Sequence, residues 1–329
     1  MGMGGKMKYR NTYKEIKKAK KIYIVGHVNP DGDSIGACFS LALGLKKLKK
    51  DVSVIMSSHS YIYDFFPHIK ETKTSIDEEI DLLIVVDASE LSRTILTSED
   101  IKNVKKVIKL DHHRTNVIPN KEDIIDPTSP AACQIIYEFL TDIKVKIDQD
   151  IAMYIYSGIL TDTGSFNYSS TTKKTLDIAA KLIDTGFDFA YICRKLNDTL
   201  RESKLKLISR TVENMEVYLN GDIRYSFVPY SFMLENNIED EDAEGMSNYL
   251  RKIEGTKIAV YVRENSKGLF KVSLRSNEDV DLSDIAIYFG GGGHKRAAGY
   301  TMNSQKEYKT NKEELFKKMN EKILNIKNK

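Results

Sequence analysis

The sequence has no tryptophan, only three cysteines and six prolines among its 329 residues, and no long uninterrupted apolar run. A membrane-spanning helix needs roughly 18 or more consecutive apolar residues, so we expect no such helix. The basic N-terminus also lacks the apolar core of a secretory signal peptide. The cysteines, Cys38, Cys133 and Cys193, lie far apart and form no Cys-x-x-Cys pair. We therefore expect a cytoplasmic protein whose cysteines are free and buried.

The charges nearly balance, because 50 lysines and arginines face 47 aspartates and glutamates, which leaves a formal net charge of +3. A calculated pI of about 8.4 is too mildly basic to predict tight duplex binding through counterion release. A small anionic substrate fits this charge better. The hydrophobic content of 41% and the charged content of 29% are those of a soluble globular protein. A chain of this length exceeds one hydrophobic core, so two domains are expected.

Strand and helix patterns alternate along the first half of the chain. Apolar runs predict strands over 22–25, 52–56, 82–86 and 107–110, and helical spacing predicts helices over 33–50, 131–140, 151–160 and 174–183. This βαβ pattern implies an α/β fold with a parallel sheet. We predict an N-terminal domain over 1–186, a helical linker over 187–215 and a smaller C-terminal α/β domain over 216–329. The C-terminal domain begins with a hairpin signal at Asn220-Gly221.

Four apolar segments of the first domain end in carboxylate or imidazole groups. The segments are followed by His27, Asp31 and Asp33, by Asp87, by Asp111-His112-His113, and by Asp162 after 155–160. In open α/β sheets the ligand crevice lies outside the carboxyl ends of the strands, so we expect these groups to meet. Oxygen and nitrogen donors without thiolates suit Mn²⁺ or Mg²⁺ ahead of Zn²⁺, and cations relieve the repulsion between carboxylates. We predict a site for two divalent ions with the ligands His27, Asp31, Asp33, Asp87, His112 and Asp162.

Taken in order, these motifs make the sequence resemble the DHH phosphoesterase superfamily, in its DHH/DHHA1 branch. The motifs are His27-Val28-Asn29-Pro30-Asp31-Gly32-Asp33, Asp87-Ala88-Ser89, Asp111-His112-His113, Thr161-Asp162-Thr163-Gly164 and a late glycine-rich stretch over 290–299. The resemblance implies a bilobed α/β protein with a metal-binding domain, a DHHA1 substrate domain and a cleft. It assigns one ion to His27, Asp31 and Asp87, and the other to Asp33, Asp87, His112 and Asp162.

The residues around the third motif are expected to act on the substrate. Asp111 is expected to orient a neighbouring ligand. Because adjacent residues of a strand face opposite sides, we expect His113 to point away from His112. The resemblance gives His113 the substrate phosphate or the leaving oxygen as its partner. Arg114 and Asn116 are candidates for contacts with phosphate or base, and plain loop residues are the alternative.

A second group of substrate candidates lies in the C-terminal domain. The backbone amides of Gly291, Gly292 and Gly293 suit the close approach of an anion, and a flexible turn is the alternative. Arg275, His294 and Arg296 complete a predicted phosphate clamp. The resemblance identifies Arg275 and His294 with the substrate arginine and histidine of the family.

The resemblance implies hydrolysis of short RNA oligonucleotides, of linear dinucleotides such as pApA, and of 3′-phosphoadenosine 5′-phosphate (pAp) to AMP. The implied cofactors are two divalent ions, with Mn²⁺ ahead of Mg²⁺. Two alternatives stay open, a cyclic-dinucleotide (c-di-AMP) phosphodiesterase and a nucleotide-binding regulator without activity. We expect neither a membrane nor stable duplex nucleic acid as a partner. The oligomeric state, a homodimer included, is left open.

Overall fold

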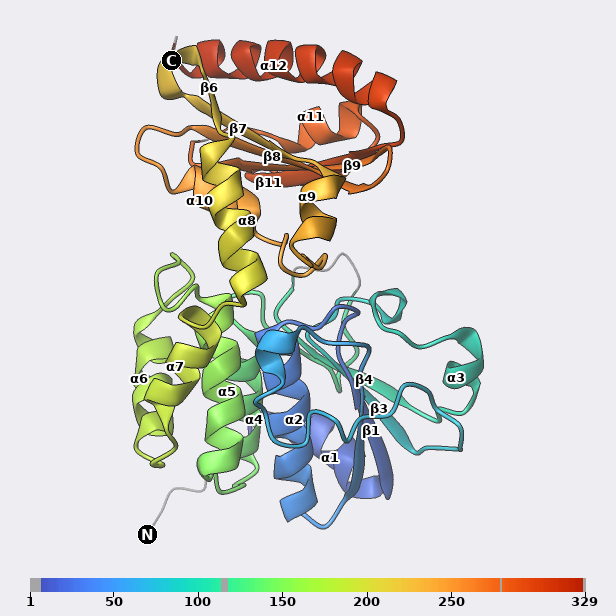
Figure 1. Cartoon of the computed structure of the whole chain (residues 1–329). Coiled ribbons are helices and arrows are strands. Elements are labelled where there is room, and N and C mark those ends of the chain that lie inside the picture. The colour runs from blue at the N-terminus through green and yellow to red at the C-terminus, as the bar shows by residue number, and fades with distance from the viewer. Residues whose placement is uncertain (1–6, 114–117, 279, 328–329) are drawn as a thin grey trace. The chain divides into compact units, whose positions relative to one another are not determined.

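The computed structural model describes residues 7–113, 118–278 and 280–327, in a chain that divides into two compact units, 1–199 and 200–329 (Figure 1). Each unit has its own sheet and its own core. The residues of the predicted linker form two helices, α7 (Phe189–Asn197) in the first unit and α8 (Glu202–Glu213) in the second. The predicted domain bounds themselves stay a prediction.

The first unit is built on a five-stranded sheet in which every neighbouring pair of strands is parallel. The order is β2 (Asp51–Ile55), β1 (Lys21–Val25), β3 (Leu82–Val86), β4 (Val107–Asp111) and β5 (Ile124–Ile125). The central strand β3 is entirely apolar and entirely buried, as expected for a parallel strand covered on both faces. The α/β fold with a parallel sheet is therefore confirmed.

Helices cover the two faces of this sheet unequally. One face packs against most of the helices of the unit in its largest apolar cluster, which includes Ile24, Ile84 and Leu110. The opposite face, with Tyr23, Leu83 and Val85, packs against a smaller cluster near α3. The helices of the unit besides α7 are α1 (Arg10–Lys18), α2 (Gly32–Lys47), α3 (Ser98–Lys102), α4 (Ala132–Asp142), α5 (Gln149–Asp162) and α6 (Lys173–Ile183). Short 3₁₀ turns lie at Tyr61–Tyr63 and Leu91–Arg93.

The second unit contains a six-stranded mixed sheet. Its order is β10 (Gly292–His294), β11 (Ala297–Met302), β9 (Leu269–Ser276), β8 (Ile258–Ser266), β7 (Ile223–Val228) and β6 (Glu216–Tyr218). Only the pair β7 and β8 is parallel among these described strands. The predicted hairpin is confirmed, because β6 and β7 pair antiparallel around a 3₁₀ turn at Leu219–Gly221.

Two apolar clusters hold the helices of the second unit against its sheet. One cluster joins Val272 and Leu274 of β9 to α11 (Ser283–Tyr288) and α12 (Gln305–Lys327). The other joins Ala259 and Tyr261 of β8 to α8, α9 (Tyr230–Glu235) and α10 (Met246–Arg251). The helices thus lie on both faces of the sheet, as Figure 1 also shows.

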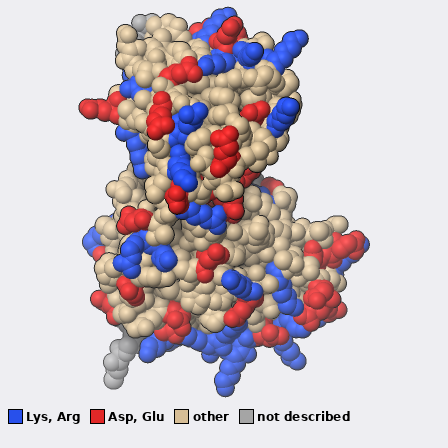
Figure 2. Space-filling model, in the orientation of Figure 1, with Lys and Arg blue, Asp and Glu red and all other residues tan. Residues whose placement is uncertain are grey.

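The distribution of surface charge and the state of the cysteines can be compared with the expectations from the composition. On the face seen in Figure 2, basic and acidic side chains are mixed over both units. Cys38 and Cys133 are free and buried as expected, whereas Cys193 is free and partly exposed. Within the described part of the chain, no helix combines the length and the apolar character that a membrane crossing requires.

Candidate metal centre

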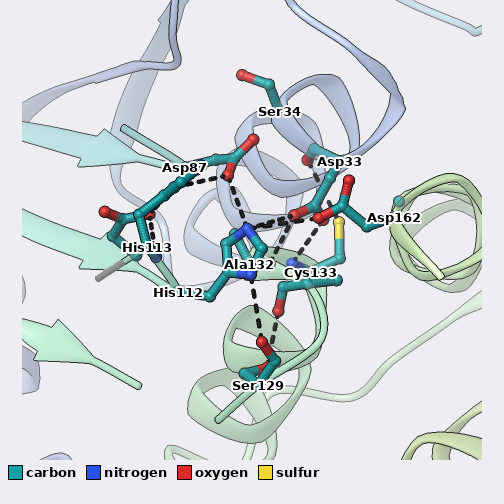
Figure 3. A network of polar contacts seen from close by, with 12 residues as sticks. Asp33, Ser34, Asp87, His112, His113, Ser129, Ala132, Cys133 and Asp162 are labelled. Carbon is teal, nitrogen blue, oxygen red and sulfur yellow. Dashed lines mark hydrogen bonds and ion pairs between the residues drawn. The ribbon is translucent and has the colours of Figure 1, made fainter. Parts of the chain in front are cut away.

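Three neighbouring strands of the first sheet deliver polar side chains to one edge. His27 follows β1, Asp87 follows β3, and His112 and His113 follow β4. Because β1, β3 and β4 are adjacent and parallel, their carboxyl ends meet at that edge. Figure 3 shows Asp87, His112 and His113 gathered there.

Helices supply the remaining carboxylates. Asp33 lies in the first turn of α2, and Asp31 is the residue that caps this helix, because its Oδ1 accepts hydrogen bonds from the amides of Asp33 and Ser34, both at 3.0 Å. Asp162 is the last residue of α5. Asp162 therefore reaches the site from the end of the helix predicted over 151–160, whereas the other three apolar segments of the set are strands. The six predicted metal ligands nevertheless lie together.

Asp87 lies at the centre of the cluster of carboxylates and imidazoles. Its Oδ2 lies 3.4 Å from Nε2 of His27, and its Oδ1 lies 3.3 Å from Nε2 of His112 and 3.6 Å from Nδ1 of His113. The backbone of Asp87 has a φ of 52°, in the left-handed region that aspartate tolerates better than most residues. The side chain is 3% exposed, so these contacts are shielded from water.

The described donors form three overlapping groups, each with ligand atoms within 4.8 Å of one another. The groups are His27, Asp31 and Asp87; Asp33, His112 and Asp162; and Asp87, His112 and His113. In the second group, His112 Nε2 lies 3.4 Å from Asp162 Oδ2 and 3.8 Å from Asp33 Oδ2. Asp87 belongs to two groups and has two carboxylate oxygens, so it can be shared by neighbouring ions, whereas His112 offers one Nε2 and can bind one ion.

The donor set fits divalent cations. Asp87 Oδ1 is buried and accepts no hydrogen bond from the described residues, so a cation would supply a partner to an oxygen whose described contacts are only the ion-pair distances to His112 and His113. Both imidazoles of the predicted ligand set are also oriented by backbone carbonyls. The Nδ1 of His27 donates to the carbonyl of Val28 at 2.8 Å, and the Nδ1 of His112 donates to that of Ser129 at 3.2 Å. Each Nε2 is thereby left to the carboxylate side, as in metal sites whose histidines are fixed by a second partner.

Protons balance the carboxylates when no cation is bound. Burial opposes a charge on His27, but the carboxylates of Asp31 and Asp87 outweigh burial and raise its pKa to about 10. The pKa of His112 is also raised, because Asp87 and Asp33 outweigh its burial. Burial and neighbouring negative charge raise the pKa of the Asp33 and Asp162 carboxyls. A divalent ion must therefore displace bound protons from this site.

Asp33 is held by a helix that has no side-chain cap of its own. Its Oδ2 accepts a hydrogen bond from the amide of Ala132 at 2.6 Å, and its Oδ1 accepts one from the amide of Cys133 at 2.9 Å. Both amides belong to the first turn of α4, whose capping position is Ala131. The sequence contains a faint signal of this contact, because Ala131 offers no oxygen to the exposed amides of the helix. Sequence reasoning did not find the partner.

His113 does not point away from His112, so that expectation is wrong. The centroids of the two imidazole rings lie 4.7 Å apart. The reason is that β4 ends at Asp111, so the strand alternation no longer applies to the two histidines. The buried Asp111 holds His113, since its Oδ1 accepts hydrogen bonds from Nδ1 of His113 at 2.8 Å and from the amide of His113 at 3.2 Å. The side chain of His113 remains 43% exposed.

The substrate candidates of the C-terminal domain lie on three adjacent strands of the second sheet. Ala297 on β11 pairs with Arg275 on β9 and with His294 on β10, so these three residues form one row across the sheet. Arg275, Gly291 and Gly292 line a cavity of about 580 Å³ within this unit. Gly293 pairs with Ala298, and Arg296 is exposed in the turn between β10 and β11. The candidates Arg114 and Asn116 lie outside the described residues.

Comparisons with known proteins agree with both units. The family model described as the DHH family, N-terminal domain, matches residues 21–159, and the DHHA1 domain model matches residues 222–325. A Thermus thermophilus protein named bifunctional oligoribonuclease and PAP phosphatase NrnA is 30% identical over 295 residues, which cover 88% of this chain and 86% of that protein. A Mycoplasma genitalium protein of the same name is 32% identical over 305 residues, covering 89% and 92%. The crystal structure of an exopolyphosphatase-related protein from Bacteroides fragilis is similar with a TM-score of 0.82 and 26% identity, covering 94% of this chain and 95% of that one.

Proposed function

The chain belongs to the DHH phosphoesterase family, in the branch that carries a DHHA1 domain, and we propose on this premise that it hydrolyses short RNA oligonucleotides and linear dinucleotides to mononucleotides, and pAp to AMP. The observation that carries the proposal is the convergence of carboxylates and imidazoles on Asp87. Relatives that span most of the chain carry the oligoribonuclease and PAP phosphatase name, which supports the substrate class.

We assign one ion to His27, Asp31 and Asp87, and a second to Asp33, Asp87, His112 and Asp162, with Mn²⁺ as the preferred metal and Mg²⁺ as the substitute. When bound, such ions supply Lewis acidity and a water of lowered pKa for in-line attack on phosphorus. The protein supplies the fixed geometry. The carbonyls of Val28 and Ser129 set the two imidazoles, and the first turn of α4 sets Asp33.

His113 is the group that we assign to proton transfer. The adjacent Asp111 raises the pKa of His113 against the opposing effect of burial, so the imidazole stays protonated to a higher pH than an ordinary histidine. The half-exposed ring is accessible to a substrate while Asp111 holds its position. His113 would then donate a proton to the leaving oxygen, and Asp111 would stabilise the charged imidazole beforehand.

Residues of the DHHA1 domain are proposed to bind the substrate. Arg275 and His294 flank the small Ala297, which leaves room between them for an anionic group. The amides of the glycine run are proposed to approach the same anion, with Arg296 close in sequence. Arg114 and Asn116 remain proposed contacts from the first domain.

The test is hydrolysis of pApA, pAp, c-di-AMP and pyrophosphate in parallel, with Mn²⁺ and with chelator. We expect metal-dependent release of AMP from pApA and pAp. Asp87→Asn should lower that rate by at least about a hundredfold, because it removes the shared ligand. Asp184→Asn, at an exposed carboxylate after α6, is the matched control and should retain the rate. Exclusive cleavage of c-di-AMP, or full activity of Asp87→Asn with metal bound, would overturn the proposal.

A further inference from the structure

The cavity lined by Arg275, Gly291 and Gly292 lies on one half of a sheet face. Along β9, Lys271, Ser273 and Arg275 alternate with the buried Val272 and Leu274, so the three polar residues share the face opposite α11 and α12. On the same face of β8, Ala259 and Tyr261 are buried under the α8–α10 cluster. Among the described elements of this unit, the helices thus cover the β8 side of this face and not the side formed by β9, β11 and β10.

The floor of this cavity is nearly free of side chains. Gly292 pairs with Gly299, and Gly299 pairs with Ser273, so the middle row consists of two glycines and a serine. A Cβ added at Gly292 would meet no atom within 4 Å, which means that open space lies above it. A flat backbone surface of this kind admits a broad planar group such as a nucleobase.

A positively charged side chain lies at each end of this cavity floor. Arg275 is half-buried, and its only described partner is the carbonyl of Leu274 at 2.9 Å. Lys271 is exposed, and no carboxylate pairs with it among the residues that the structure describes. The neighbouring Arg263 differs, because it is 3.1 Å from Asp240 Oδ1. No aspartate or glutamate is among the lining residues, so the cavity has the charge that an extended anion requires.

The two cationic side chains stand far enough apart to contact two different phosphates, because side chains on one face of a strand project roughly perpendicular to the sheet. Lys271 and Arg275 are four residues apart on a strand, which separates their Cα atoms by about 13 Å. The two phosphates of pAp flank a single ribose, whereas the phosphates of an oligonucleotide continue beyond it. Resting on the proposed function, we infer that the cavity holds consecutive nucleotides of a short RNA. Arg275 binds the phosphate common to all substrates, and Lys271 binds the phosphate of a further nucleotide. Lys271 is thus a specificity residue for oligonucleotides over pAp.

The experiment compares pAp with a 5′-phosphorylated adenylate trinucleotide in the presence of Mn²⁺. Lys271→Met should lower kcat/KM for the trinucleotide by about two- to fivefold, chiefly through KM, because one exposed ion contact is lost. The value for pAp should be unchanged. In a salt series, the slope of log kcat/KM against log salt for the trinucleotide should become shallower by about 0.7, the contribution of one phosphate on a single strand. Lys267→Met, in the turn between β8 and β9 outside the cavity, is the control and should leave both substrates and both slopes unaltered.

Failure of the inference and failure of the proposed function give different results. If the unmodified protein cleaves both substrates and Lys271→Met leaves the trinucleotide KM and its salt slope unchanged, the role of Lys271 is refuted and the function stands. An equal loss for pAp and trinucleotide also refutes it, because Lys271 would then contact the common phosphate. If the unmodified protein cleaves neither substrate, both the proposed function and the inference about Lys271 are refuted.

Discussion

Replacing Gly158 with alanine should damage both the packing of the first unit and its metal site. Gly158 lies in α5, where this helix packs closely against α2 near Gly36. A Cβ at position 158 would lie 2.3 Å from Cys133 Sγ, 2.7 Å from Asp33 Oδ1 and 3.0 Å from Asp33 Cα. Ordinary contacts are about 3.5–4.0 Å, so α5 must move away from α2 or Asp33 must shift. Either movement changes the position of Asp33 relative to Asp162.

The magnitude follows from two opposing effects. Overpacking a close-packed interior costs about 2–3 kcal/mol at a contact that includes backbone atoms. Alanine in place of glycine within a helix stabilises the folded state by about 1 kcal/mol, because alanine has the higher helix propensity. The net destabilisation is therefore about 1–2 kcal/mol, which corresponds to a fall in Tm of about 2–8 °C for a unit of this size. Displacement of Asp33 should weaken Mn²⁺ binding by at least about tenfold.

The assay is thermal unfolding of the metal-free protein, followed by calorimetric titration with Mn²⁺. Gly44→Ala is the matched control, because its added Cβ lies 2.5 Å from Leu140 Cδ2 at a point of α2 remote from the ligands. It should lose stability without losing Mn²⁺ affinity. Adding Cys133→Ala to Gly158→Ala should restore part of the Tm but not the affinity, since the contact with Asp33 remains. Wild-type Tm and wild-type affinity in Gly158→Ala would refute the reasoning.

Two further predictions concern protons. Asp111→Asn keeps the shape of the carboxyl but removes the charge that raises the pKa of His113, so the alkaline limb of the kcat/KM profile should move to lower pH; an unmoved limb would exclude His113 as the proton donor. Without metal, the folded protein binds more protons than the unfolded chain at each group whose pKa is raised, so its stability should fall as pH rises. The fall begins above the ordinary carboxyl pKa of about 4 and continues as the histidines, ordinarily near 6.5, lose their protons on the way to about 10. The groups with a raised pKa are His27, His112, Asp33 and Asp162. Melting curves at pH 6.5 and 9 in the presence of chelator test the predicted fall in stability. Saturating Mn²⁺ should abolish or reverse the difference in Tm between the two pH values.

The parallel sheet and the gathering of the metal-ligand candidates were predictable from the sequence. Apolar runs that end in polar residues fix both the strands and the edge at which their ends meet, and His27, Asp87 and His112 follow from that rule alone. Asp162 was drawn into the same set although it ends a helix, because an apolar run followed by an acid looks the same in either element. Its position depends on the packing of α5 against α2, which is a tertiary property.

Other features depended on contacts that no local pattern encodes. The direction of His113 is decided by where β4 stops, and strand ends are the least certain part of a sequence prediction. The hydrogen bonds from α4 to Asp33 join residues about 100 positions apart. The row of His294, Ala297 and Arg275 follows from the register of β9, β10 and β11, which the separate motifs do not contain. From the sequence, the glycine run was consistent with a flexible turn or with an anion-binding site. In the structure, Gly292 and Gly293 belong to strand β10.

Because Asp33 caps α4, the loss of Asp33 and the loss of the partly exposed Asp162 should have different consequences in evolution. Asp33 supplies the partner that the first turn of α4 otherwise lacks, so its loss would harm the fold as well as the reaction. Asp162 ends a helix, where an ionised carboxylate opposes the helix dipole, so its loss would relieve the fold while removing a proposed metal ligand. In a lineage released from selection for activity, Asp162 should be replaced early and Asp33 should persist. A gene copy that retains the first and third motifs but has lost the fourth is therefore the expected form of a decaying member of this family.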